Sequence, residues 1–154
     1  MNSEFDNAYL GFDPGKEGAM AVIGPHLIPS AHAFDRHVYV EKLADLKKQF
    51  NLFAVVEHVG AMSGQGVTSC FSFGESFGWL QGVLDAMRIP YELARPQKWK
   101  KVFSCTSDKN TSIAVAERLF PEVDLRRTPL CRKPHDGKAE ALLIAEYARR
   151  IRNG

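Results

Sequence analysis

The sequence predicts a mixed α/β domain in which an antiparallel hairpin joins a partly parallel sheet that is flanked by helices. Two short apolar runs, residues 8–12 and 19–23, lie on either side of an Asp-Pro-Gly turn signal at 13–15. Residues 52–56 are apolar without interruption, as expected for a parallel strand that is buried on both faces. Segments with helical spacing follow that run towards the C-terminus.

The remaining elements are predicted from the same patterns. Spacing of three and four residues predicts the first helix, with apolar positions at Val40, Leu43, Leu46 and Phe50. Either Ser107 or Asp108 is expected to cap the helix that starts at Lys109. The expected elements are a third strand over 28–34, helices over 38–50 and 69–87, a short strand over 90–94, and helices over 109–120 and 136–151.

Length and composition describe one ordinary globular domain. The chain has 154 residues, of which 45% are hydrophobic, and we expect a single domain over 1–154. Residues 1–87 carry a net charge of −5 and residues 88–154 a net charge of +7. The basic half suits a polyanionic partner such as nucleic acid, although an unevenly charged, solvated surface is the other interpretation.

Several features indicate the cytoplasm. No apolar run approaches the ~20 residues that a membrane span needs, so no membrane association is expected. The polar, acidic N-terminus does not resemble a signal peptide. Three widely spaced cysteines indicate neither a zinc site nor a disulfide framework.

Asp13 and Glu57 each lie where a predicted strand ends. Asp13 closes the first strand, although Asp is also common in turns for purely structural reasons. Glu57 directly follows the apolar run 52–56. A buried carboxylate at that position is costly unless it is paired or binds a cation. An exposed strand end is the alternative interpretation.

Asp136 and Glu140 lie four residues apart at the start of the last predicted helix. This spacing puts both carboxylates on one helix face, where they repel each other unless a positive group lies between them. Asp136 could instead cap the helix. Glu140 shares its face with the apolar Ile144 and Tyr147, so it is expected to point along the apolar stripe.

These four acids predict a metal-dependent nuclease. Hard oxygen donors without a His/Cys cluster indicate Mg²⁺, with Mn²⁺ as a substitute. Acids from two strand ends and one helix can converge at one end of a sheet and hold two cations ~3.5–4 Å apart across a scissile phosphate. The predicted metal ligands and catalytic residues are Asp13, Glu57, Asp136 and Glu140.

Four segments together resemble the RuvC family of Holliday junction resolvases. They are residues 10–15 (LGFDPG), the strand that ends at Glu57, residues 96–100 (PQKWK) and residues 136–145 (DGKAEALLIA). The similarity extends from about Tyr9 to Arg149, and the compact form is similar to the phage-encoded branch. The resemblance implies an RNase H-like fold, a homodimer and paired nicks across a four-way DNA junction. A phage enzyme would act in the cytoplasm of a bacterial host.

The resemblance also implies roles for single residues. Asp13, Glu57, Asp136 and Glu140 match the family's acidic tetrad, and Lys100 and Lys109 match lysines that support catalysis near the scissile phosphate. In the bacterial host enzymes the last two site residues are usually three apart and end in Asp, whereas here they are four apart and end in Glu. This departure leaves the role of Asp136 in question, with His135 as a substitute candidate.

Basic residues gather in segments where DNA would run. Phosphate contacts would supply affinity without reading the base sequence, although each residue could also be a solvated surface charge. The loop over 61–66 could enter the junction centre, with Met62 as an apolar wedge, or could be a plain connection. The residues assigned to DNA contact are Met62, Ser63, Gln65, Lys98, Lys100, Lys101, Lys109, Arg132, Lys133 and Lys138.

Other functions on these residues have to be weighed. A flap- or fork-type endonuclease for branched DNA would use the same acids, so the sequence does not separate it from a resolvase. A non-catalytic DNA-binding module of the same fold is expected to have lost at least one acid, and all four are present. The glycine-containing hairpin at 11–15 also resembles that of actin-like kinases, but those need two such domains.

Overall fold

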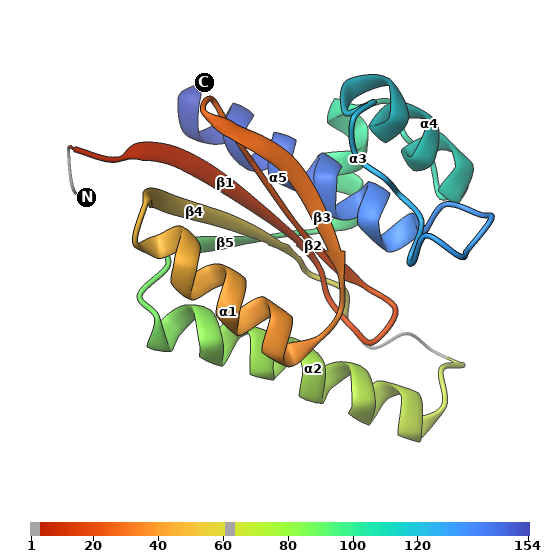
Figure 1. Cartoon of the computed structure of the whole chain (residues 1–154). Helices are drawn as coiled ribbons and strands as arrows, with labels where there is room; N and C mark the ends of the chain where they lie inside the picture. The colour runs from red at the N-terminus through yellow and green to blue at the C-terminus, as the bar shows by residue number, and fades with distance from the viewer. Residues whose placement is uncertain (1–3, 61–63) are drawn as a thin grey trace.

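The computed structural model describes residues 4–60 and 64–154, and these contain a five-stranded mixed sheet between two layers of helices (Figure 1). Strands β1 (Asp6–Asp13), β2 (Ala19–Gly24) and β3 (Leu27–Ala33) pair antiparallel. Strand β4 (Phe50–Glu57) pairs in parallel with β1, and β5 (Tyr91–Ala94) pairs in parallel with β4. The sheet order is β3-β2-β1-β4-β5, which confirms the predicted hairpin and central parallel strand.

Each face of the sheet is covered by its own helices. Helices α1 (Arg36–Lys47) and α2 (Val67–Ala86) cover one face (Figure 1). Helix α5 (Asp136–Asn153) crosses the other face, with α3 (Pro96–Val102) and α4 (Lys109–Leu119) packed beside it. Among the described residues, no helix has the length and apolar character that a membrane crossing requires.

Strand β4 contributes to both cores. Phe53 and Val55 belong to the cluster under α5, while Ala54 and Val56 belong to the cluster under α1 and α2. Residues 52–56 are all buried. Burial on both faces is what the apolar run predicts, because a two-sided central strand has no solvent face on which to place polar residues.

Gly11 allows α5 to lie directly on β1. A Cβ atom at Gly11 would lie 2.1 Å from the carbonyl oxygen of Ala141 and 2.3 Å from the backbone nitrogen of Ala145. Any larger residue would therefore push the helix away from the sheet. This contact brings the N-terminal turns of α5, including Glu140, beside the end of β1 where Asp13 lies.

The first helix differs from its prediction. Asp35 caps α1 by accepting hydrogen bonds from two backbone amides, so the helix starts at Arg36 and not at 38. The prediction that Phe50 extends the helical stripe is wrong, because Phe50 pairs with β1 as the first residue of β4. Val40, expected in that stripe, is 40% exposed, and its neighbour Tyr39 is buried instead.

Helix α3 is not among the predicted elements. Pro96 occupies its first turn, where the missing N–H costs nothing, and Arg95 precedes it in an extended conformation. Only Trp99 and Phe103, four residues apart, form its buried face. The lysines between and beside them hide this short apolar pattern in the sequence.

Candidate functional site

Three carboxylates meet at the edge of the sheet where β1 and β4 end. Asp13 is the last residue of β1 and Glu57 the last of β4, and these parallel neighbours end at the same edge. Glu140 joins them from the second turn of α5. One carboxylate oxygen from each of the three lies within 4.8 Å of the others. Glu57 is 5% exposed and Glu140 1%, so both are largely withdrawn from water.

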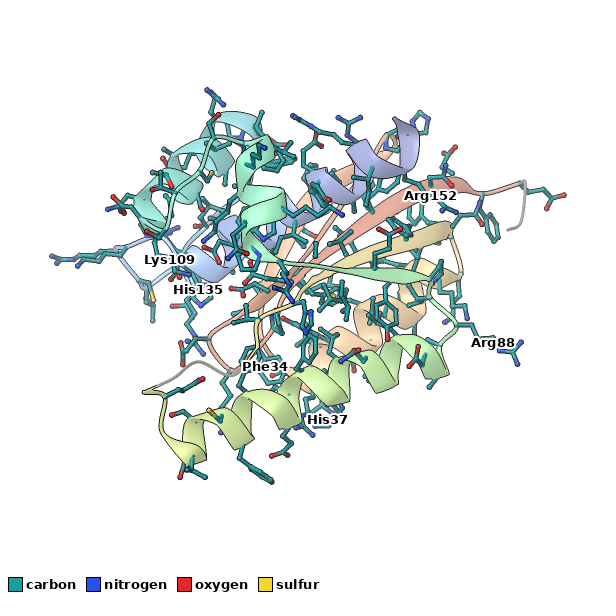
Figure 2. The ribbon with its side chains drawn as sticks, turned by 180° about the vertical axis from the view of Figure 1, so that it is seen from behind. Phe34, His37, Arg88, Lys109, His135 and Arg152 are labelled. Atoms are coloured by element: carbon teal, nitrogen blue, oxygen red, sulfur yellow. The ribbon has the colours of Figure 1, made fainter. Side chains whose placement is uncertain are left out.

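A cleft opens beside these acids. It has a volume of about 540 Å³ and is lined by Asp13, the β1–β2 turn, the first turns of α2, Gln65, Lys109 and Asp136. Figure 2, seen from behind, places Lys109 and His135 together at the N-terminal end of α5, with Arg152 at the far end of the helix. The cleft therefore gives solvent and ligands access to Asp13 and Asp136.

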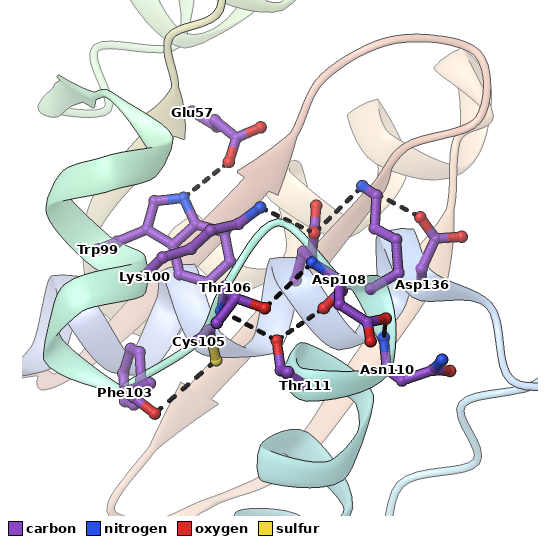
Figure 3. A network of polar contacts seen from close by, with 12 residues as sticks. Glu57, Trp99, Lys100, Phe103, Cys105, Thr106, Asp108, Asn110, Thr111 and Asp136 are labelled. Atoms are coloured by element: carbon purple, nitrogen blue, oxygen red, sulfur yellow. Dashed lines mark hydrogen bonds and ion pairs between the residues drawn. The ribbon is translucent and has the colours of Figure 1, made fainter.

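Glu57 is held by an indole group. The Trp99 Nε1–H donates to Glu57 Oε2 at 2.7 Å, between two buried side chains (Figure 3). Burial raises the pKa of Glu57, the hydrogen bond from Trp99 partly offsets this, and the charge of Glu140 adds to the rise. The carboxylate is thus fixed in orientation but remains short of positive charge.

Glu140 is paired with two lysines. Its Oε1 lies 3.1 Å from Lys109 Nζ and 3.6 Å from Lys100 Nζ. The same Lys109 ammonium lies 3.3 Å from Asp136 Oδ2 (Figure 3). Lys109 is therefore the positive group that the spacing of Asp136 and Glu140 requires.

A hydrogen-bonded turn presents Lys109 to the acids. Asp108 caps α4 by accepting from the Asn110 backbone amide at 3.0 Å, and its own amide donates to Thr106 Oγ1 at 3.2 Å (Figure 3). Lys109 is consequently the first residue of α4, where the helix dipole disfavours a cation. Burial also works against its charge, but Glu140, Asp13 and Asp136 together raise the pKa of Lys109.

The acids carry more charge than the lysines neutralise. Burial raises the pKa of Asp13 well above its usual value, and the charges of Glu57 and Glu140 raise it further. Among the described residues, the ion pairs of Asp13, Glu57, Glu140 and Asp136 involve two ammonium groups, those of Lys100 and Lys109. Converging oxygen donors with excess negative charge fit a hard divalent cation, which would bridge carboxylates at this separation.

Comparison with known proteins identifies the fold. Neither a family model nor a curated protein sequence matches the chain. RuvC of T. thermophilus, solved in complex with a Holliday junction substrate, is similar with a TM-score of 0.61 and 13% identity, over 94% of this chain and 96% of that chain. A second Thermus thermophilus RuvC structure has a TM-score of 0.59 and 14% identity, with the same coverage.

This chain has the RuvC fold. The RNase H-like arrangement expected from the sequence, a mixed sheet flanked by helices, is thereby confirmed. At this level of identity the likeness concerns the path of the chain.

Asp136 and His135 lie beside the three converging carboxylates. Among the described residues, the three carboxylates that converge within 4.8 Å do not include Asp136, whose side chain is 47% exposed. The helix cap is His135 and not Asp136, because His135 Nδ1 accepts the Lys138 backbone N–H at 3.1 Å. Burial lowers the pKa of His135.

The residues predicted to contact DNA differ in exposure, and Lys100 and Lys109 among them pair with Glu140. Lys98, Lys101, Arg132 and Lys133 are exposed, and Gln65 lines the cleft. Lys138 differs from its prediction: it is 9% exposed, and its ammonium donates to the Arg126 carbonyl at 2.6 Å, so it is not available to a phosphate. Met62 and Ser63 lie outside the described residues.

A second groove lies along the ends of β4 and β5. It has a volume of about 590 Å³ and is lined by His58, Leu93, Arg95, Gln97 and Lys98. His58 follows Glu57 directly and stacks on Phe77 of α2. The groove is therefore basic, and it begins one residue from a candidate metal ligand.

The role of Trp99 is not apparent from the sequence. Its neighbours Lys98, Lys100 and Lys101 are basic, whereas the Trp99 ring is fully buried. The signal for burial was the four-residue spacing between Trp99 and Phe103, which is typical of one face of a short helix.

Proposed function

We propose that this chain is a divalent-metal-dependent DNA endonuclease that resolves four-way junctions, in one RuvC-like domain over 1–154. The carrying observation is the convergence of Asp13 with the buried Glu57 and Glu140 at the edge of the sheet. It occurs on a fold shared with a RuvC whose structure contains a Holliday junction substrate. A purely structural cluster would be paired by enough positive charge, whereas in the part of the chain that the structure describes two lysines serve these three acids and Asp136.

The proposed cation is Mg²⁺, with Mn²⁺ as a substitute. Asp13, Glu57 and Glu140 would hold it. Asp136 would be a fourth, more exposed ligand, and its carboxylate now pairs with Lys109. Two such ions, when bound, supply an activated water and stabilise the leaving oxygen of the phosphodiester. The burial of Glu57 and Glu140 strengthens their interaction with any cation that replaces the lysines.

Lys100 and Lys109 have a second proposed use. Both ammonium groups lie at Glu140, and Lys109 also lines the cleft. A phosphate held at the acids would accept hydrogen bonds from them, which favours the charge that builds up during hydrolysis. The Lys100 side chain is 17% exposed and that of Lys109 is 54% exposed, so Lys100 is the more confined of the two to the site.

The exposed basic residues form the proposed DNA surface. Lys98 and Arg95 line the groove next to Glu57, and Lys101 lies on the same helix as Lys98. Arg132 and Lys133 extend the surface towards the start of α5. The loop with Gln65, together with Met62 and Ser63, is the part proposed to reach the junction centre. Phosphate contacts of this kind make binding weaken steeply as salt rises.

We further propose a homodimer of the compact, phage-encoded type that acts in the bacterial cytoplasm. A four-way junction has two-fold symmetry, and two symmetric nicks require two active sites related by a two-fold axis. One chain supplies one group of converging acids in its described residues.

The test is cleavage of four DNA substrates with Mg²⁺: a mobile four-way junction, a flap, a fork and a plain duplex. The expected result is two symmetric nicks in the junction, no cutting of the duplex, and a dimer by sedimentation at micromolar concentration. A monomer that nicks one strand of the flap or fork in preference would replace the resolvase with a branched-DNA endonuclease. Junction binding without cleavage in Mg²⁺ or Mn²⁺ would leave a DNA-binding module.

Replacing Lys100 should slow cleavage with little effect on folding. Lys100→Ala is expected to reduce the rate by about 10- to 100-fold, the usual size of an effect at a group next to a metal ligand. The melting temperature should change little, because Lys109 still neutralises Glu140.

Lys101→Ala is the matched control for this rate measurement, since Lys101 is exposed on the same helix. It should affect the rate much less. Equal losses in both variants would mean that the lysines act only through their general charge.

A further inference from the structure

Glu57 makes its hydrogen bond to a group that can only donate. The indole N–H of Trp99 donates to Glu57 Oε2 at 2.7 Å. An indole nitrogen cannot accept a hydrogen bond and carries no charge. Trp99 is 0% exposed, so water does not compete for this hydrogen bond. The contact therefore restricts how the Glu57 carboxylate can rotate without neutralising it.

The local fold delivers this side chain to Glu57. Glu57 is paired with Ala94 in the parallel register, and the backbone N–H of His58 donates to the Ala94 carbonyl at 2.8 Å. The chain then turns into α3 at Pro96, so that Trp99, in the first turn of that helix, lies over the end of β4. The same short segment thus orders the strand end and supplies the donor.

The next residue of α3 serves a second acid. Lys100 pairs with Glu140 at 3.6 Å, and its ammonium lies 5.4 Å from the centre of the Trp99 ring. One helix turn therefore contacts two of the three converging carboxylates with a neutral and a charged donor. Core packing alone accounts for the burial of the Trp99 ring, but it does not require the N–H to point at Glu57.

We infer that Trp99 is a positioning residue for the metal site: its N–H holds the Glu57 carboxylate where one oxygen lies near those of Asp13 and Glu140. This inference rests on the proposed function, because it assumes that Glu57 is a metal ligand. Removing a donor that orients a metal ligand typically lowers metal affinity or activity by about 10- to 100-fold. Trp99 would then set metal affinity from a position that touches neither the metal nor the DNA.

Metal affinity separates positioning from packing. Trp99→Phe removes the donor and keeps an aromatic ring, and it is expected to weaken Mn²⁺ binding, measured by calorimetry, by about 10- to 100-fold. Phe103→Leu is the matched control, since Phe103 is buried in the same core and its ring packs against Arg150. It should lose similar stability and keep its Mn²⁺ affinity. Equal weakening in both variants would overturn the inference.

The indole N–H signal of Trp99 gives a second test, which does not depend on whether a Trp99 variant folds. The chain has two tryptophans, and Trp79→Phe assigns their two indole N–H signals in a ¹H–¹⁵N spectrum. Glu57→Gln, which replaces a charged acceptor with a neutral one, should move the Trp99 signal and leave the Trp79 signal in place.

Addition of Mg²⁺ to the wild type should also move the Trp99 signal. If the amides of Asp13 and Glu140 shift while the Trp99 indole does not, the metal site stands and the inference is wrong. If no signal shifts with Mg²⁺ or Mn²⁺, the proposed metal site is wrong, and the positioning role is overturned with it.

Discussion

Glu57→Gln is expected to reduce Mg²⁺-dependent junction cleavage by more than about 100-fold, beyond the usual range for a residue that only orients a ligand. Glutamine keeps the shape of the side chain and can still accept the Trp99 hydrogen bond, but it lacks the charge that a hard cation needs. Junction affinity in a binding assay without metal should change little, because the proposed phosphate contacts lie on separate basic residues.

Glu92→Gln is the control for the loss of one negative charge, since Glu92 is exposed on the neighbouring strand β5. It should cleave like the wild type. Asp13→Asn and Glu140→Gln should match Glu57→Gln, whereas Asp136→Asn should have a smaller effect because Asp136 lies outside the converging group. Near-normal nicking by Glu57→Gln would show that the active site lies elsewhere.

Asp13→Asn should stabilise the metal-free protein while it removes activity. Burial raises the pKa of Asp13 most, and repulsion by the charges of Glu57 and Glu140 raises it further. Removing its charge relieves this repulsion, and a gain of about 1 kcal/mol corresponds to a rise in melting temperature of about 2–4 °C for a chain of this size. Melting both proteins in chelator measures the difference. In millimolar Mg²⁺ the order should reverse, because the wild type binds the ion more tightly and is stabilised by that binding.

The same charge makes the stability of the metal-free protein depend on pH. Since the folded-state pKa of Asp13 exceeds its unfolded value, the folded state binds a proton that the unfolded state has released, and stability falls as pH rises through that interval. Glu57 contributes with the same sign.

As pH rises above the ordinary carboxyl range, the wild type in chelator should therefore lose stability more steeply than Asp13→Asn. Mg²⁺ should flatten the slope, because it favours the deprotonated carboxylates. A wild type that becomes more stable than Asp13→Asn as pH rises in chelator would contradict the repulsion between the acids.

The sequence was sufficient for features that depend on local pattern. Two short apolar runs and the turn residues between them predicted the β1–β2 hairpin, and an uninterrupted apolar run predicted that β4 is central and buried on both faces. Acids at strand ends are also visible in a sequence, because the period of a strand and the place where it stops are local properties. For this reason Asp13 and Glu57 could be named together before any contact between them was known.

Other features were decided by the tertiary structure, because they depend on contacts between distant segments. The close approach of α5 to Gly11 brings Glu140 to Asp13 and leaves Asp136 at the rim. The spacing of Asp136 and Glu140 called for a positive group, but only the packing of α4 against α5 shows that it is Lys109. Packing also buries Lys138 against a carbonyl and turns Trp99 towards Glu57. A side chain's neighbours across the core are determined by how helices and sheet pack, and no local propensity encodes them.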